Sequence, residues 1–301
     1  MTTPIEEKVF ESDTKAKLPL AFVLRRLHSL LGLWLCFYLF EHLLVNSQAA
    51  WFFQDDGYGF VKAVNFIHSL PYLKGVEVIL LGLPFLIHAV WGIEYLRTSK
   101  LNSFKTRAAA PSLPQYKRNR AYSWQRIFAW VLLVGIIAHV VQMRFVDYPI
   151  LVYDNDIKHY LVKVKEDAAL DSVAEKLHAK IYLGAELRQL RKKKWVSEAK
   201  SFRLKDNQVV VLSPNAGAAF FLIVRETMKD PWMVILYSIF VIAAAYHAFN
   251  GVWTFMITWG ITLTRFSQKR MRAITTTLMG IAMILGLAAI WGPYWTFLFQ
   301  R

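Results

Sequence analysis

Long apolar stretches alternate with polar, basic connections along the whole chain. Five stretches are mostly nonpolar, at residues 27–47, 72–96, 124–144, 232–262 and 273–299. A helix needs about 20 such residues to cross the hydrocarbon core of a bilayer, so each stretch is long enough to span a membrane. The pattern predicts an all-α membrane protein with five transmembrane helices, which we number I to V in chain order.

The connection between helices III and IV departs from this pattern. It mixes charged residues with short apolar runs and is too long for an ordinary loop. Residues 159–165 and 208–212 alternate in polarity or are β-branched, which favours strands. Residues 168–194 have apolar side chains at helical spacing (Leu170, Val173, Leu177 and Ile181). We therefore expect a small α+β insertion outside the membrane.

These patterns divide the chain into four parts. The parts are a cytoplasmic N-terminal segment (1–26), helices I to III (27–144), an extracytoplasmic insertion (145–231) and helices IV and V (232–301).

The amino-acid composition is that of a membrane protein, and its cysteine count excludes two kinds of covalent link. The chain is 55% hydrophobic, with a mean hydropathy of +0.31 and 11 tryptophans. Tryptophan rings often anchor helices at membrane interfaces. Cys36 is the single cysteine, which excludes an intrachain disulfide and a c-type haem attachment.

The positive charge predicts an orientation and not a nucleic-acid partner. The net charge is +15, and the II–III and IV–V connections are basic and contain no acidic residue. Arg25 and Arg26 precede helix I, whereas the short I–II connection contains Asp55 and Asp56. Short basic loops remain on the cytoplasmic side, so we expect the N-terminus inside and the C-terminus outside.

Four of the apolar stretches each contain one histidine: His42, His88, His139 and His247. An ionisable residue at membrane depth is costly and usually functional. Four of them, one in each of helices I to IV, favour ligands acting in pairs. Buried imidazoles with few cysteines or carboxylates nearby are typical of b-type haem, so we expect two haems with histidines on both sides of each iron.

Depth along the helices indicates how the histidines pair. At a rise of 1.5 Å per residue, His42 lies about 24 Å from Arg26 and His139 about 20 Å from Arg126. His88 lies only about 13 Å from Arg97. His42 and His139 therefore form an outer pair, and His88 is left with His247. Gly92, Gly135 and Gly251 lie four residues from three of these histidines, where they would leave room for a flat macrocycle.

Haem propionates need cationic or hydrogen-bonding partners at the membrane faces. Arg25, Arg26 and Ser29 are the inner candidates, and Arg144 is the outer one. His28, beside Arg25 and Arg26, would contact a propionate or a quinone; interfacial packing is an equally plausible role for it.

Several segments around the histidines match a known family. They are residues 22–32 (FVLRRLHSLLG), 42–46 (HLLVN), 88–92 (HAVWG), 247–253 (HAFNGVW) and 258–262 (TWGIT). Together they resemble the dihaem cytochrome b subunit of bacterial succinate dehydrogenase, the single-chain, five-helix anchor of complex II.

The resemblance implies a function for the whole assembly. In that family the matching histidines are the axial ligands. By resemblance, His88 and His247 would hold the haem nearer the cytoplasm, and His42 and His139 the outer one. Such anchors sit in the bacterial cytoplasmic membrane and bind a flavoprotein and an iron–sulfur subunit. They pass electrons from succinate through the haems to a quinone, usually menaquinone, in the respiratory chain. This chain has no nucleotide-binding or iron–sulfur motif, so the dicarboxylate chemistry would belong to its partners.

The chain departs from the family pattern in two ways, and two alternative functions remain open. The insertion is far longer than the family's III–IV connection. Some fumarate-reducing relatives have a glutamate two residues before the helix IV ligand, where this chain has Ala245, which favours succinate oxidation. A quinol:fumarate reductase anchor is the first alternative. A haem-free transporter or scaffold, whose histidines serve a substrate or protons, is the second.

Overall fold

A computed structural model describes residues 18–51, 57–98, 113, 115–190, 193–199, 202 and 204–299. Within it, five helical segments are long and apolar enough to cross a membrane. They are Leu20–Ala50, Leu73–Thr98, Lys117–Val146, Pro231–Thr258 and Arg265–Phe299. The five long apolar helices predicted from the sequence are thus confirmed, by length and composition. Asp55 and Asp56 lie outside the described residues.

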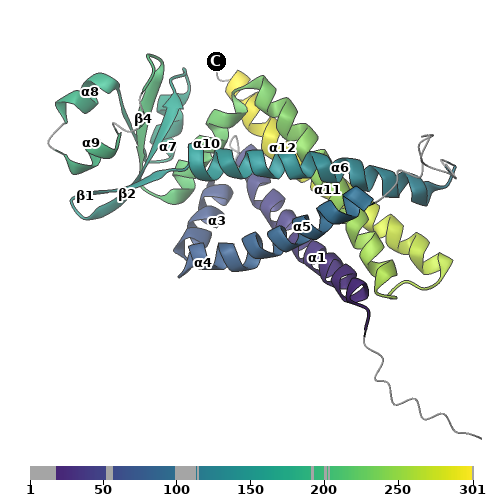
Figure 1. Cartoon of the computed structure of the whole chain (residues 1–301). Helices are drawn as coiled ribbons and strands as arrows, with labels where there is room; N and C mark the ends of the chain where they lie inside the picture. The colour runs from purple at the N-terminus through teal and green to yellow at the C-terminus, as the bar shows by residue number, and fades with distance from the viewer. Residues whose placement is uncertain are drawn as a thin grey trace, which may run out of the picture.

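The five spans are built from the longest helices of the fold. Span I is α1 (Leu20–Ser47), which continues into a 3-10 turn (Gln48–Trp51). Spans IV and V are α11 (Pro231–Thr258) and α12 (Arg265–Phe299). These three helices pack together, and α1 begins at the opposite end of the bundle from the C-terminus (Figure 1).

Spans II and III each contain a π-helical turn toward one end. Span II consists of α4 (Leu73–Glu77), a π-helical turn (Val78–Gly82) and α5 (Leu83–Thr98). Span III consists of α6 (Lys117–Val141) and a second π-helical turn (Gln142–Val146). Trp34 on α1 donates its indole N–H to the carbonyl of Leu80 at 2.6 Å, which joins span I to the first of these turns.

Strands and short helices form a separate layer beside the bundle (Figure 1). The strands are β1 (Ile150–Asp154), β2 (Ile157–Lys165), β3 (Lys180–Tyr182) and β4 (Gln208–Ser213), in the antiparallel order β1-β2-β4-β3. The helices are α7 (Leu170–Lys176), α8 (Gly184–Gln189), α9 (Lys194–Ala199) and α10 (Ala216–Met228). The predicted strands and the small sheet are confirmed.

The helix expected over residues 168–194 is only partly correct. It ends at Lys176, and Ile181 lies in strand β3, where it pairs with Val211. His178, between the two, adopts a φ of 52°, a left-handed conformation that ends a helix. Spacing alone did not reveal this break, because Ile181 continues the apolar pattern by coincidence.

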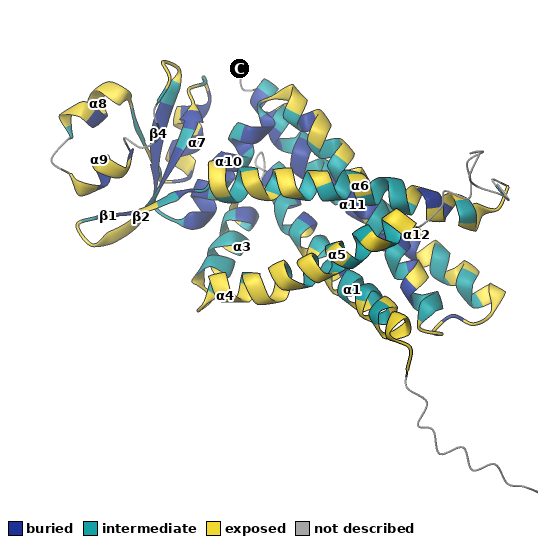
Figure 2. Ribbon diagram, viewed as in Figure 1, coloured by how far each residue is buried: buried dark blue, intermediate teal, exposed yellow. Residues whose placement is uncertain are grey.

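Helices cover both faces of the sheet. Val162, Val164, Val209 and Val211 pack with Leu170 of α7 and Leu222 of α10, while Leu161, Val210 and Leu212 pack with Trp195 of α9. Burial on both faces explains why strand β4 is apolar throughout and does not alternate. Figure 2 shows β4 as largely buried.

An additional helix, α3 (Tyr58–Ser69), follows span I and docks on α10. Asn65 accepts a hydrogen bond from the Gly217 backbone at 2.8 Å and donates to Asn215 at 3.0 Å. A side chain at Gly217 would meet the backbone of Val61 at 2.3 Å, so this contact requires glycine. The I–II connection therefore packs against the same layer as the insertion.

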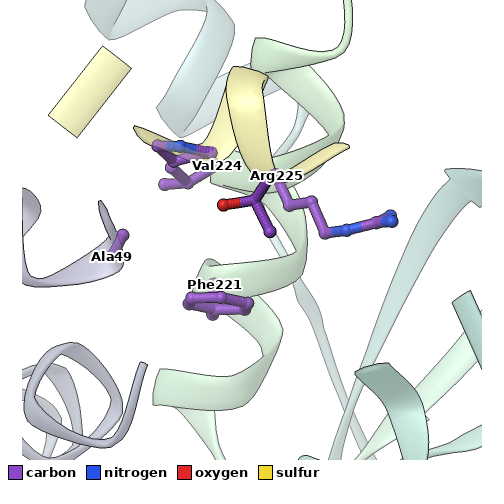
Figure 3. Close-up of a pocket in the computed structure, with 6 residues that line it drawn as sticks. Ala49, Phe221, Val224 and Arg225 are labelled. Atoms are coloured by element: carbon purple, nitrogen blue, oxygen red, sulfur yellow. The ribbon is translucent and has the colours of Figure 1, made fainter. Parts of the chain in front are cut away.

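A small cavity lies where α10 and α12 meet the end of span I (Figure 3). Its volume is about 10 Å³, and its lining includes Phe221, Arg225 and Pro293. That volume is close to the minimum for a single water molecule, so the cavity is too small for an organic ligand and is not a candidate site.

Candidate functional site

The four histidines lie on four different spans: His42 on α1, His88 on α5, His139 on α6 and His247 on α11. The fold brings them together as two pairs. The ring centres of His42 and His139 are 6.0 Å apart, and those of His88 and His247 are 6.3 Å apart. Depth along the helices predicted the His42–His139 pair, and elimination predicted the His88–His247 pair.

The spacing within each pair suits a shared metal atom. An imidazole nitrogen binds a metal at about 2.0–2.1 Å and lies about 1 Å from the ring centre, so opposed ligands have centres about 6 Å apart. The two rings of each pair are also close to perpendicular, at 78° and 87°, so neither pair is stacked. Each separation leaves room for an iron atom between the rings.

Three of the four histidines are held through the ring nitrogen Nδ1. His88 donates to the backbone carbonyl of His28 at 2.9 Å, and His247 donates to that of Gln125 at 3.3 Å. The Tyr237 hydroxyl donates to Gln142, so it accepts from His139 Nδ1 at 3.1 Å. A histidine fixed in this way presents Nε2 as the free ligand, and metal-binding histidines usually have such a partner.

His42 differs from the other three. Its Nδ1 faces the side-chain amide nitrogen of Asn46 at 3.5 Å, the limit of a hydrogen bond. That Asn46 nitrogen instead donates to the backbone carbonyl of His42 at 2.8 Å. His42 therefore has the least firmly oriented ring of the four.

The helices that supply His88 and His139 are loosely packed. In α5, which is described in full, no residue is buried, and α6 buries only Ala121 and Ser123. The apolar core of the spans instead lies among α1, α11 and α12, and Figure 2 shows α5 and α6 as half-buried or exposed. A planar apolar group between the helices would add the packing that they lack.

The glycines near the histidines have different neighbours from those expected. A Cβ on Gly135 would meet the Phe240 ring at 2.4 Å, and one on Gly92 would lie 3.4 Å from His28. The glycine that matters for a ligand is Gly32 on α1, where a Cβ would lie 2.8 Å from Cε1 of His88. Gly32 lets the His88 ring rest against the α1 backbone.

His28 stacks on His88. The ring centres are 4.0 Å apart and the planes differ by 8°, with Tyr95 edge-on to His28 at 5.4 Å. The Nδ1 atom of His28 is buried without a hydrogen-bond partner. His28 thus belongs to the surroundings of the inner pair, where it has an unused polar atom.

Other unpartnered polar atoms lie at the same end of the bundle. Among the described residues these are Trp91 Nε1, Arg126 Nη1, Trp253 Nε1 and Thr262 Oγ1. All of these groups can donate a hydrogen bond, and buried donors usually have acceptors. The acidic groups of a haem are suitable acceptors, so the residues present fit a haem at this end.

The remaining predicted residues lie at the two ends of the spans. Arg25 is exposed. Arg26 donates to the Thr258 carbonyl at 3.0 Å, and Ser29 accepts from the Trp259 indole at 3.0 Å, so both join α1 to the end of α11. Arg144 pairs with Glu77, and its guanidinium lies 4.9 Å from the Tyr148 ring centre. Arg26, Ser29 and Arg144 therefore have structural partners within the chain.

The described residues contain no group of three or more His, Cys, Asp or Glu side chains that could hold a metal ion. A haem differs from a bare ion because its macrocycle supplies four of the iron ligands, which leaves only two for the protein. Two histidines per site are therefore sufficient for haem. The sequence did not single out Gln125, Asn250 or Tyr237, although each is a polar residue within an apolar span.

Comparison with known proteins agrees with this site. No protein-family model and no solved structure matches the chain. One curated protein is 25% identical over 270 residues, which cover 89% of this chain and 95% of the relative. Along nearly its whole length the chain is therefore similar to the succinate dehydrogenase cytochrome b558 subunit of Bacillus subtilis, which confirms the resemblance of the chain to that family.

Proposed function

We propose that this chain is the membrane-anchor cytochrome of a succinate:quinone oxidoreductase and that it binds two b haems. His88 and His247 would be the axial ligands of the inner haem, and His42 and His139 those of the outer one. The observation that carries the proposal is the pair geometry, with ring centres 6.3 and 6.0 Å apart on four separate helices.

The chain's own residues would hold and orient the haems. Haem iron supplies one-electron chemistry, because it can alternate between ferric and ferrous forms. Two imidazole ligands from different helices keep the coordination the same in both forms, which limits the rearrangement that accompanies electron transfer. Gly32 and the Nδ1 hydrogen bonds of His88, His139 and His247 would fix the ligand rings.

The partners follow from the name of the relative and from the charge of the chain. A flavoprotein and an iron–sulfur subunit would dock at the cytoplasmic ends of the spans, which are rich in arginine and lysine. Electrons would enter near the inner pair and reduce a quinone in the membrane, with menaquinone as the expected acceptor. Ala245, two residues before His247, is buried and cannot move a proton, which favours succinate oxidation.

The orientation in the membrane forms part of the proposal. The basic II–III and IV–V connections would face the cytoplasm of a bacterium, with the N-terminus inside and the C-terminus outside. The sheet and α7 to α10 would then form an extracytoplasmic layer at the end of the bundle near the outer pair.

The test is a visible spectrum of the purified protein. We expect a reduced-minus-oxidised spectrum with a b-haem α-band and a stoichiometry of two haems per chain. Absence of the band would exclude the proposal and favour a haem-free transporter or scaffold. Copurification with the two catalytic subunits, and haem reduction by succinate in that complex, would test the partners separately.

A further inference from the structure

Gln125 on α6 contacts the His247 segment of α11 at three points. Its carbonyl accepts from His247 Nδ1 at 3.3 Å, its side-chain amide donates to the His247 carbonyl at 3.0 Å, and its side-chain oxygen accepts from Asn250 at 2.8 Å. Asn250 is buried, and Gly251 leaves room for the Gln125 amide nitrogen, which would lie 3.7 Å from a Cβ there. The side chain of Gln125 thereby holds its own carbonyl against the histidine ring.

Gln142, on the same span, supports the outer pair through one intermediate. Its side-chain oxygen accepts from the Tyr237 hydroxyl at 3.0 Å, and that hydroxyl lies 3.1 Å from His139 Nδ1. Because the tyrosine proton is directed to Gln142, its oxygen must accept from the histidine. Gln142 therefore determines which ring nitrogen of His139 bears the proton.

The two glutamines are 17 positions apart in the sequence, or about 25 Å along a helix. Each is linked to a histidine of a different pair. Within a bilayer, such polar side chains find partners on neighbouring helices because lipid offers none. One span thus has a separate polar support for each pair.

We propose that Gln125 and Gln142 are positioning residues, each serving one haem site: Gln125 the inner site through His247, and Gln142 the outer site through Tyr237 and His139. The inference rests on the proposed function, because it assigns the roles of these residues toward the haems. Gln142 fixes the tautomer of His139 through Tyr237, and the side chain of Gln125 fixes the position of the backbone carbonyl that accepts from His247. Loss of such support typically weakens metal binding by about 10- to 100-fold.

Gln125→Met and Gln142→Met form a matched pair, since methionine keeps the length of the side chain and removes its side-chain hydrogen bonds, while the backbone carbonyl at position 125 remains. The two haems of the whole purified complex can be distinguished by potentiometric titration and by their low-spin electron paramagnetic resonance signals. We expect Gln125→Met to alter the inner component only and Gln142→Met the outer one only. Transfer of haem to a scavenger protein should be about 10- to 100-fold more favourable from the affected site.

Asn250→Ala keeps the inference testable if Gln125→Met does not assemble. It removes only the hydrogen bond to the Gln125 side chain, so it should change the inner component in the same direction by a smaller amount. Gln125→Glu, which retains an acceptor for Asn250, should restore part of the wild-type signal.

The outcomes separate this inference from the function on which it rests. A wild-type protein without haem would overturn both. A wild-type protein with two haems, whose signals are unchanged in both methionine variants or altered equally by each, would overturn only the roles of Gln125 and Gln142.

Discussion

The insertion and the histidine-bearing spans II and III are packed in opposite ways. In the insertion, Leu161, Trp195 and Val210 are almost completely buried. In α5 no residue is buried, and it packs along α1, where His88 hydrogen-bonds the His28 carbonyl and stacks on the His28 ring. The insertion has a closely packed apolar core, to which Phe60 of α3 and Ala49 at the end of span I also contribute, whereas the side chains of spans II and III are mostly half-buried or exposed.

The same contrast holds for charge. Asp167 of the insertion pairs with Arg225 and Lys229, both at 2.7 Å, and all three side chains are at least 89% buried. In the spans, the Glu77–Arg144 pair lies near one end and is partly exposed. A substitution in the insertion should therefore leave the haem sites intact, and a substitution at a haem site should leave the insertion folded.

The largest expected effect is the loss of a ligand. His247→Ala should remove the inner haem, so that the haem content falls from two per chain to about one, while the insertion remains folded. Haem content and hydrogen exchange of the β4 amides measure the two properties. Complete retention of both haems would contradict the ligand assignment, and loss of protection in β4 would contradict the independence of the regions.

Asp167→Asn tests the converse, namely that damage to the insertion leaves the haem sites intact. The change removes the carboxylate that pairs with the buried Arg225, while Lys229 keeps Glu226 as a partner at 2.7 Å. Breaking a buried pair costs about 3–5 kcal/mol. Hydrogen exchange should show weaker protection in β2 and α10, and the haem spectrum should not change. Asp171→Asn, on the same α7 segment but exposed, is the control and should change neither.

Acid should reproduce the Asp167→Asn effect in the wild-type protein. Burial alone would raise the pKa of Asp167, but hydrogen bonds from Arg225 and Lys229 hold it well below its usual range. A lowered pKa stabilises the fold fully above the unfolded value of about 3.9, and the contribution is lost as the pH falls further. Below about pH 4 the β2 amides should lose protection in the wild type, with a weaker pH dependence in Asp167→Asn.

Gly32→Ala should have the smallest effect and should be confined to the inner pair. The new methyl group would lie 2.8 Å from His88 Cε1, and overpacking of this kind costs about 1–3 kcal/mol. The redox potential of the inner haem should shift while that of the outer haem stays constant. Gly280→Ala on α12, where a Cβ meets nothing within 4 Å, is the matched control, and an equal shift in both variants would contradict the role of Gly32.

Much of this architecture could be predicted from the sequence because bilayers impose simple lengths. The spans followed from apolar runs, the outer histidine pair followed from residue counts to the nearest arginine, and the inner pair followed by elimination. Helix α3 was missed because its apolar side chains, such as Phe60, form a face that is buried only by tertiary contacts with α10 and the end of span I. The roles of Gln125 and Tyr237 were missed because a polar residue in an apolar span shows that a partner is needed, but helix rotation determines which one.

The π-helical turn at Val78–Gly82 has a consequence for how span II tolerates change in length. Glu77 and His88 are 11 positions apart, so at 3.6 residues per turn they would share one face of an uninterrupted α-helix. The extra residue of a π turn rotates the helix before it by about 100° relative to the helix after it. Glu77 is thereby directed to Arg144 and away from the ligand face. Deleting one residue from this turn would restore a regular helix in which the two residues are ten positions apart, and at about 100° per residue this keeps Glu77 about 80° away from His88. The turn can therefore lose one residue without changing the angular registry between the two halves of the span.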